Sequence, residues 1–159
     1  MADTEERLRE FIEQHPALAQ GEVILAAAKG MPLGGTKKFA KDRGPMLVGG
    51  AVGAFIAHAR DKKVVVDDLE AAMRNGVYLL ATDRRLLLVS AGGLRRLPQE
   101  HIGSVDRSRV SRVERGVTKV SMVKMLTATF QLDDGSELAF EFPKIDTKDA
   151  ERVLQSFGV

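Results

Sequence analysis

The second half of the chain consists of short apolar segments separated by turn residues, and this pattern constrains the fold more than any other feature. Residues 77–82 and 86–90 are apolar runs on either side of Asp83-Arg84-Arg85. A third segment, residues 94–97, begins and ends with Leu and lies between a Gly-Gly pair and a proline. Short apolar runs bounded by turn residues are typical of strands joined by tight turns. The pattern predicts an antiparallel sheet in which these segments are consecutive strands.

The pattern returns near the C-terminus. Residues 125–132 and 137–142 alternate between apolar and polar side chains, and Asp133-Asp134-Gly135 separates them. Asp-Gly between two alternating segments is a strong signal for a β-hairpin. We therefore expect a second hairpin here.

The segment between the two hairpins allows two interpretations. Val110, Val113, Val117 and Val120 recur at helical spacing, which would give a basic helix. Gly116 and the high content of β-branched residues weaken a helix. We favour strands for residues 105–120, with the helix as the alternative.

Two amphipathic helices are expected at the ends of the chain. Residues 4–15 place Leu8 and Phe11 on one face, and Asp3 with Glu6 resembles a capping box. Residues 146–157 carry an apolar stripe and end just before Gly158, a residue suited to the position after a helix. Between them, residues 22–28 are expected to form a strand and residues 67–75 a short helix.

Charge is unevenly distributed along a chain whose formal net charge is only +2. Residues 29–63 hold eight basic and two acidic residues, and residues 84–119 hold nine basic and three acidic residues. The second block is rich in Arg, which favours bidentate contacts to phosphate or carboxylate. The alternative is an ordinary solvated surface whose arginines are partly paired with the acidic helices.

The first basic block surrounds the longest apolar run of the chain, residues 46–57. Basic side chains beside an apolar segment are typical of a surface that binds an anionic membrane or a protein partner. The alternative is that charges merely flank a buried helix. The candidate binding residues are Lys37, Lys38, Lys41, Arg43, Phe55, Ile56, Arg60, Lys62 and Lys63.

The same run contains small residues at helical spacing. Gly49, Gly53 and Ala57 would form a stripe that lets two helices approach closely, so self-association and a homo-oligomer are an alternative function. Each Gly in a helix interior is unfavourable by about 1 kcal/mol relative to Ala. Such a helix would therefore need a surface to pack against.

The segment 77–89, with Thr82-Asp83-Arg84-Arg85-Leu86 at its turn, resembles the strand–turn–strand of bacterial pleckstrin-homology (PH)-like domains, which are related to GRAM domains. Gly21-Glu22, Leu97-Pro98 and the terminal helix follow the same order, so the resemblance covers roughly residues 21–157. It implies a mainly β (α+β) fold, a bent antiparallel sheet or barrel of about seven strands capped by the C-terminal helix. An acidic helix in residues 1–20 would precede a domain at 21–159 that carries a helical or irregular insertion at about 30–76.

The resemblance implies a noncatalytic binding module for lipid headgroups or protein partners. We expect no enzymatic activity, cofactor or metal site, because the three His are isolated in sequence and no nucleophile–base arrangement stands out. Nucleic acid is disfavoured, because the chain offers only one Tyr and seven Phe for base stacking. The acidic N-terminus lacks a signal-peptide pattern, so we expect a cytoplasmic protein, peripheral at the inner face of the membrane if it binds lipid.

Overall fold

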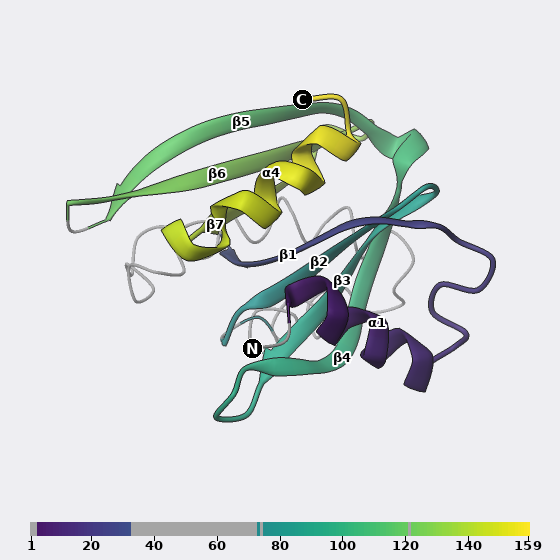
Figure 1. Cartoon of the computed structure of the whole chain (residues 1–159). Coiled ribbons are helices and arrows are strands. Elements are labelled where there is room, and N and C mark those ends of the chain that lie inside the picture. Colours follow the sequence, from purple (N-terminus) through teal and green to yellow (C-terminus); the bar gives the residue numbers. More distant parts are fainter. Residues whose placement is uncertain (1–2, 33–72, 74, 121) are drawn as a thin grey trace, which may run out of the picture.

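The computed structural model describes residues 3–32, 73, 75–120 and 122–159, which form two helices and one seven-stranded sheet (Figure 1). Short 3-10 turns, η3 (Arg107–Arg109) and η4 (Lys144–Asp146), join some of these elements. In chain order the helices and strands are α1 (Thr4–Gln14), β1 (Ile24–Pro32), β2 (Val77–Thr82), β3 (Arg85–Gly92), β4 (Leu97–Asp106), β5 (Val110–Val120), β6 (Val123–Leu132), β7 (Glu137–Phe142) and α4 (Thr147–Ser156).

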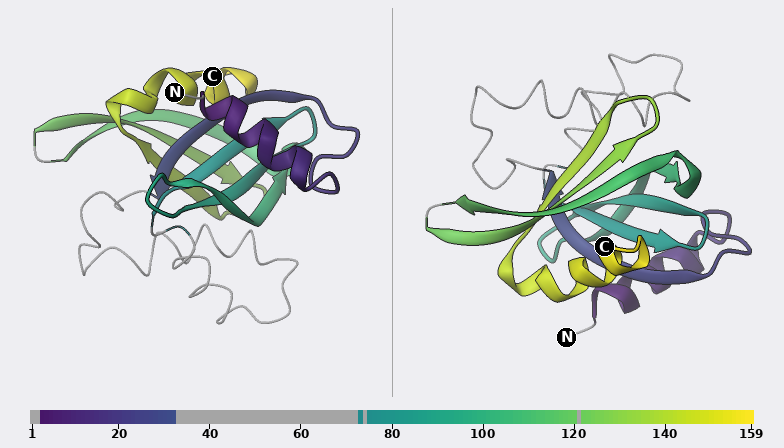
Figure 2. Two further views of the ribbon diagram at one scale, coloured as in Figure 1. Left: turned by 60° about the horizontal axis from the view of Figure 1, so that its bottom comes forward. Right: turned by 90° about the horizontal axis from the view of Figure 1, so that it is seen from above.

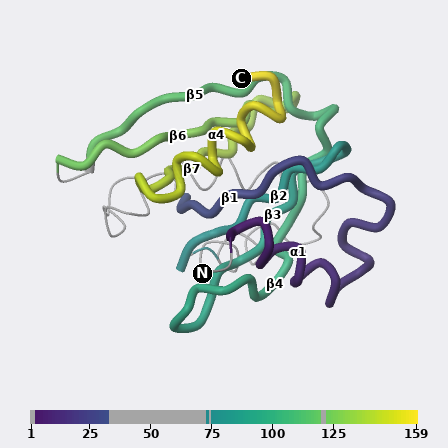
Figure 3. Tube along the Cα trace, in the orientation of Figure 1, coloured from purple at the N-terminus to yellow at the C-terminus, as the bar shows by residue number. Residues whose placement is uncertain are grey.

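The strands pair antiparallel in the order β4-β3-β2-β1-β7-β6-β5. Strand β1 belongs to both halves of the sheet, because most of its length pairs with β2 while Met31 and Pro32 pair with β7. The chain passes from one half to the other between β4 and β5 (Figure 3). A bent seven-stranded antiparallel sheet with a C-terminal helix is the PH-like architecture that the sequence predicts, and the fold class is confirmed.

The main core lies between the two halves of the sheet and α4. Helix α4 contributes Ala150, Val153 and Leu154, all at most 1% exposed, which is the apolar stripe expected from the sequence. Phe130 contacts Phe157 edge to face, with ring centroids 5.2 Å apart. Burial of these side chains on one helix face holds α4 against the sheet.

A second core lies on the outer face of β2 and β3, under α1. Leu8 and Phe11 of α1 pack in one cluster with Tyr78, Leu80 and Leu87. Both faces of β2 are therefore covered, and every residue of this strand is buried. This explains why β2 and β3 are continuous apolar runs rather than alternating segments.

Two expectations of detail are wrong, and one open choice is decided. Asp3 makes no side-chain cap at α1, so the capping box is not formed. Residues 94–96 are a turn rather than a strand, and the strand begins at Leu97. It includes Pro98, which β4 tolerates because it is an edge strand. For residues 105–120 the strand interpretation is confirmed except at the 3-10 turn Arg107–Arg109, since β4 ends at Asp106 and β5 covers Val110–Val120.

Candidate functional site

Most arginines of the basic block 84–119 are engaged within the protein. Arg85 pairs with Glu22 at 2.8 Å and donates to the Leu18 carbonyl, and Arg115 pairs with Glu151 at 2.6 Å. The other ion pairs of this block are Arg109 with Asp133 and Asp134, and Arg112 with Glu114. Paired guanidinium groups are poorly placed to bind phosphate. The pairs agree with the interpretation of a surface partly neutralised by acidic partners.

Arg107 has a structural role. Its Nε donates to the Thr82 carbonyl at 2.5 Å and its Nη1 to the Ser156 carbonyl at 2.9 Å. The guanidinium lies over the Phe157 ring, 3.9 Å from the centroid. Burial lowers the pKa of Arg107, and Asp83 opposes this. The side chain therefore joins β2 to the end of α4.

Arg95 and Arg96 in the β3–β4 turn differ from these arginines. Within the described part of the chain, neither side chain is in an ion pair. Leu94 precedes them and is 106% exposed, the largest value among the exposed apolar side chains. The turn thus presents one apolar and two cationic side chains to solvent.

Local geometry fixes this turn. Gly93 has φ +73°, a conformation that Gly adopts without steric cost. Arg96 has φ +49°, which is unusual for a residue with a Cβ. Its carbonyl accepts a hydrogen bond from the Tyr78 hydroxyl at 2.5 Å. Tyr78 is 0% exposed, so this hydrogen bond holds Arg96 against a buried residue of the sheet.

The register places this turn at the end of the sheet where β1 stops and β2 starts. Gly30 pairs with Val77, and Val77 pairs in turn with Ser90 of β3. The chain therefore leaves β1 and re-enters β2 at the same end as the β3–β4 turn. We call this end, with residues 94–96, the insertion end of the sheet.

A cleft of about 420 Å³ opens beside the insertion end, between α1, the end of β1 and the start of α4. Six charged residues line it: Asp3, Arg7, Lys29, Arg96, Asp146 and Asp149. Among the described residues, no ion pair joins any of these six. The cleft therefore offers both cations and carboxylates to a small or extended ligand.

Burial shifts the pKa values of several side chains that line the cleft. It lowers the pKa of Lys29, an effect that Asp146 opposes. It raises the pKa of Asp146, which Lys29 opposes, and the pKa of Asp149. Burial also raises the pKa of Tyr78, against a hydrogen bond from Arg7. In each case the charged form is disfavoured because the group has lost hydration, so a bound ion of opposite charge would be stabilised at these positions.

The residues chosen from the sequence lie elsewhere. Lys37, Lys38, Lys41, Arg43, Phe55, Ile56, Arg60, Lys62, Lys63 and the stripe Gly49, Gly53 and Ala57 all lie outside the described residues, as does most of the expected helix 67–75. Sequence reasoning missed the cleft, because its residues come from positions 3 to 149 and no local pattern connects them. It also missed Leu94, which was assigned to a strand.

No helix among the described residues is long and apolar enough to cross a bilayer. No group of three His, Asp or Glu in that part of the chain is arranged to hold a metal ion.

Comparison with known proteins finds no matching family model and no similar curated protein. Among solved structures, the chain is similar to a pleckstrin homology domain from Shewanella amazonensis SB2B, with a TM-score of 0.43 and 11% identity over 92% of this chain and 96% of that one. It is also similar to a DUF1696 family protein with a pleckstrin-homology domain from Shewanella loihica PV-4, with a TM-score of 0.38 and 15% identity over 52% of this chain and 71% of that one. At these identities the likeness concerns the fold alone.

Proposed function

We propose that the chain is a noncatalytic PH-like binding module that attaches to an anionic membrane surface through the insertion end of its sheet. The observation that carries this proposal is the β3–β4 turn, where the fully exposed Leu94 precedes two arginines without ion pairs among the described residues. An apolar side chain that enters the interface, beside cations at the level of the lipid phosphates, is a common peripheral membrane contact.

The sequence around this end supports the same function. The insertion leaves β1 and returns to β2 here, and it carries the candidate binding residues Lys37, Lys38, Lys62 and Lys63. Each Lys or Arg near an anionic leaflet contributes about 1 kcal/mol, so two arginines and several lysines give reversible binding. Binding of a protein partner and self-association through the stripe Gly49, Gly53 and Ala57 stay as alternative functions. The relation to GRAM domains stays a prediction from the sequence.

Co-sedimentation with vesicles that contain phosphatidylglycerol tests this function. The wild type should bind at low salt and much less at high salt, because screening weakens the attraction. The double change Arg95→Glu and Arg96→Glu should weaken partitioning by about 30-fold or more, from the loss of two contacts of about 1 kcal/mol each. The change of Lys37, Lys38, Lys62 and Lys63 to Glu should act in the same direction.

The matched control is Arg84→Glu with Lys148→Glu, which changes the net charge equally at two exposed positions outside the turn. This control should retain most of the binding. Absence of wild-type binding at low salt, or equal losses in both double variants, would contradict a membrane contact at the insertion end. Light scattering on the wild type and on Gly53→Leu tests the self-association alternative. That alternative requires the wild type to be an oligomer and the substitution to dissociate it.

A further inference from the structure

The β5–β6 hairpin extends beyond the rest of the sheet (Figure 2). Several apolar side chains toward its end are exposed. Met122 is 95% exposed, Val117 is 65% exposed and Val123 is 54% exposed. Between Arg115 and Leu132 the sequence contains no Asp or Glu. The hairpin end is therefore both apolar and free of negative charge.

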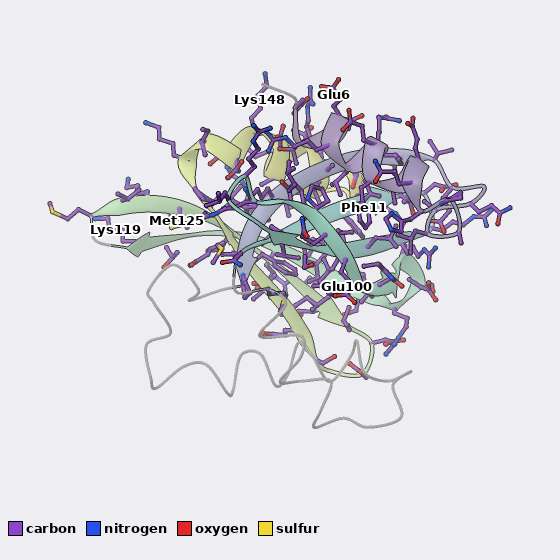
Figure 4. The ribbon with its side chains drawn as sticks, turned by 90° about the horizontal axis from the view of Figure 1, so that it is seen from below. Glu6, Phe11, Glu100, Lys119, Met125 and Lys148 are labelled. Carbon is purple, nitrogen blue, oxygen red and sulfur yellow. The ribbon has the colours of Figure 1, made fainter. Side chains whose placement is uncertain are left out.

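Two lysines lie directly opposite each other just behind the apolar end. Lys119 of β5 pairs in register with Lys124 of β6, and both are exposed (Figure 4 labels Lys119). Like charges directly opposite on neighbouring strands are destabilising. In the described part of the chain neither lysine is in an ion pair. An anion held between the two ammonium groups would relieve this repulsion.

Met122 lies in the tight turn between β5 and β6 and is an unusual residue for this position. Its φ is +71°, in the left-handed region where Gly or Asn is the usual choice. The chain instead places a large apolar side chain there, almost fully in solvent. The tight turn between the paired Val120 and Val123 accounts for the positive φ. The exposure of the apolar side chain contributes nothing to the stability of the hairpin, which points to a contact outside the protein.

We propose that the β5–β6 hairpin is a second contact with the anionic membrane, in which Met122 and Val123 enter the interface and Lys119 and Lys124 together bind a lipid phosphate. The order of groups along the hairpin favours lipid over a protein partner. Met122 and Val123 lie at the extremity and the two lysines one step behind, which matches the order of acyl chains and phosphates in a leaflet; Val117 lies two residues beyond Lys119, farther from the end. This inference rests on the proposed membrane function and adds a contact outside the insertion end.

Fluorescence gives a direct test, because the chain contains no Trp. Met122→Trp reports on the hairpin and Leu94→Trp on the insertion end, each as a single Trp. With phosphatidylglycerol vesicles we expect the emission of both variants to shift to shorter wavelength, and with pure phosphatidylcholine vesicles at low salt we expect a much smaller shift. A shift in Leu94→Trp alone would overturn the hairpin contact and leave the proposed function intact. If neither Trp variant shows a shift and the wild type does not sediment with the vesicles, both the hairpin contact and the proposed membrane function are overturned.

Charge reversal tests the lysine pair separately. Lys119→Glu with Lys124→Glu should weaken partitioning by about 30-fold or more, whereas the control Arg84→Glu with Lys148→Glu should not. Circular dichroism of each variant checks that the fold is retained. As a milder pair, Lys119→Gln and Lys124→Gln remove the repulsion and should still weaken binding. Full vesicle binding by both lysine variants would contradict the phosphate contact and favour a protein partner for the hairpin.

Discussion

Arg107 shows how a residue from a basic block can serve the fold rather than a ligand. It donates to carbonyls of Thr82 and Ser156 and lies over the Phe157 ring. A charged donor that satisfies buried carbonyls contributes more than an ordinary hydrogen bond, because its loss leaves acceptors without partners. In the sequence it is one Arg among eight in residues 84–115, and nothing local separates it from Arg95.

Arg107→Met should therefore lower the free energy of unfolding by about 2–3 kcal/mol, since it keeps the aliphatic length and removes the donors. Urea denaturation followed by circular dichroism measures this. Arg84→Met is the control, because Arg84 is exposed, and it should change stability by no more than about 0.5 kcal/mol. Equal effects of the two substitutions would show that the contacts of Arg107 add nothing.

His101 gives a pH-dependent contribution. Its Nε2 is buried without a hydrogen-bond partner among the described residues. Burial, and then the nearby Arg85, lower its pKa from 6.5, while a hydrogen bond with the Gly103 backbone opposes this. Because the folded-state pKa is below the unfolded value, the unfolded chain binds the proton first, and stability is lost as pH falls below about 6.5.

Between about pH 8 and about pH 5.5, the free energy of unfolding of the wild type should therefore fall more than that of His101→Gln. Denaturant titrations at several pH values give the free energy of unfolding of each protein as a function of pH. The change is counted for each protein from its own value at about pH 8. Carboxyl groups titrate mostly below this window, so they affect the two proteins alike. Parallel slopes would contradict the assignment of the effect to His101.

At the scale of the elements, the period of the apolar pattern explains which predictions succeed. The second hairpin and both terminal helices lie where the sequence predicts them, because each has one face buried and one exposed. The prediction of a strand at residues 94–97 was wrong for residues 94–96. Leu94 is apolar, yet it lies in a turn that is fixed by a hydrogen bond from the distant Tyr78. A contact between residues 18 positions apart leaves no trace in a local pattern.

Two glycines in strands would place an added Cβ at the same short distance from its nearest atom, but the neighbouring groups differ. A Cβ on Gly30 of β1 would lie 2.7 Å from the Phe142 ring, whose side chain is 1% exposed, and 3.0 Å from the Glu141 carbonyl. A Cβ on Gly116 of β5 would lie 2.7 Å from the Thr127 hydroxyl. The buried ring and the backbone cannot move freely, whereas the hydroxyl can rotate away.

Gly30→Ala should thus lower the free energy of unfolding by about 1–3 kcal/mol, as expected for overpacking. Gly116→Ala should change it by no more than about 0.5 kcal/mol. Thermal and urea denaturation of the pair measure the difference. A loss of similar size at Gly116 would mean that close packing, rather than the rigidity of the neighbour, determines the effect.

At the scale of the whole molecule, one sheet separates two cores. Leu8 of α1 is 0% exposed on the outer face of β2 and β3, and Val153 of α4 is 1% exposed on the inner side. The sequence predicts both helices but not which face each covers, since an apolar stripe does not identify its partner. The cleft beside the insertion end follows from this arrangement, because it lies where both helices approach the end of β1. The global fold therefore had to be known before the cleft could be found.

The two cores make a last prediction about additivity. Leu8→Ala should lower the free energy of unfolding by about 2–5 kcal/mol, and Val153→Ala by about 1–3 kcal/mol. The two side chains belong to different clusters, so their effects should add to within about 0.5 kcal/mol in the double variant. Urea denaturation in trimethylamine N-oxide keeps the double variant folded at the start of the transition. Coupling above about 1 kcal/mol would show that β2 and β3 transmit packing changes from one face to the other, and that the two clusters act as a single core.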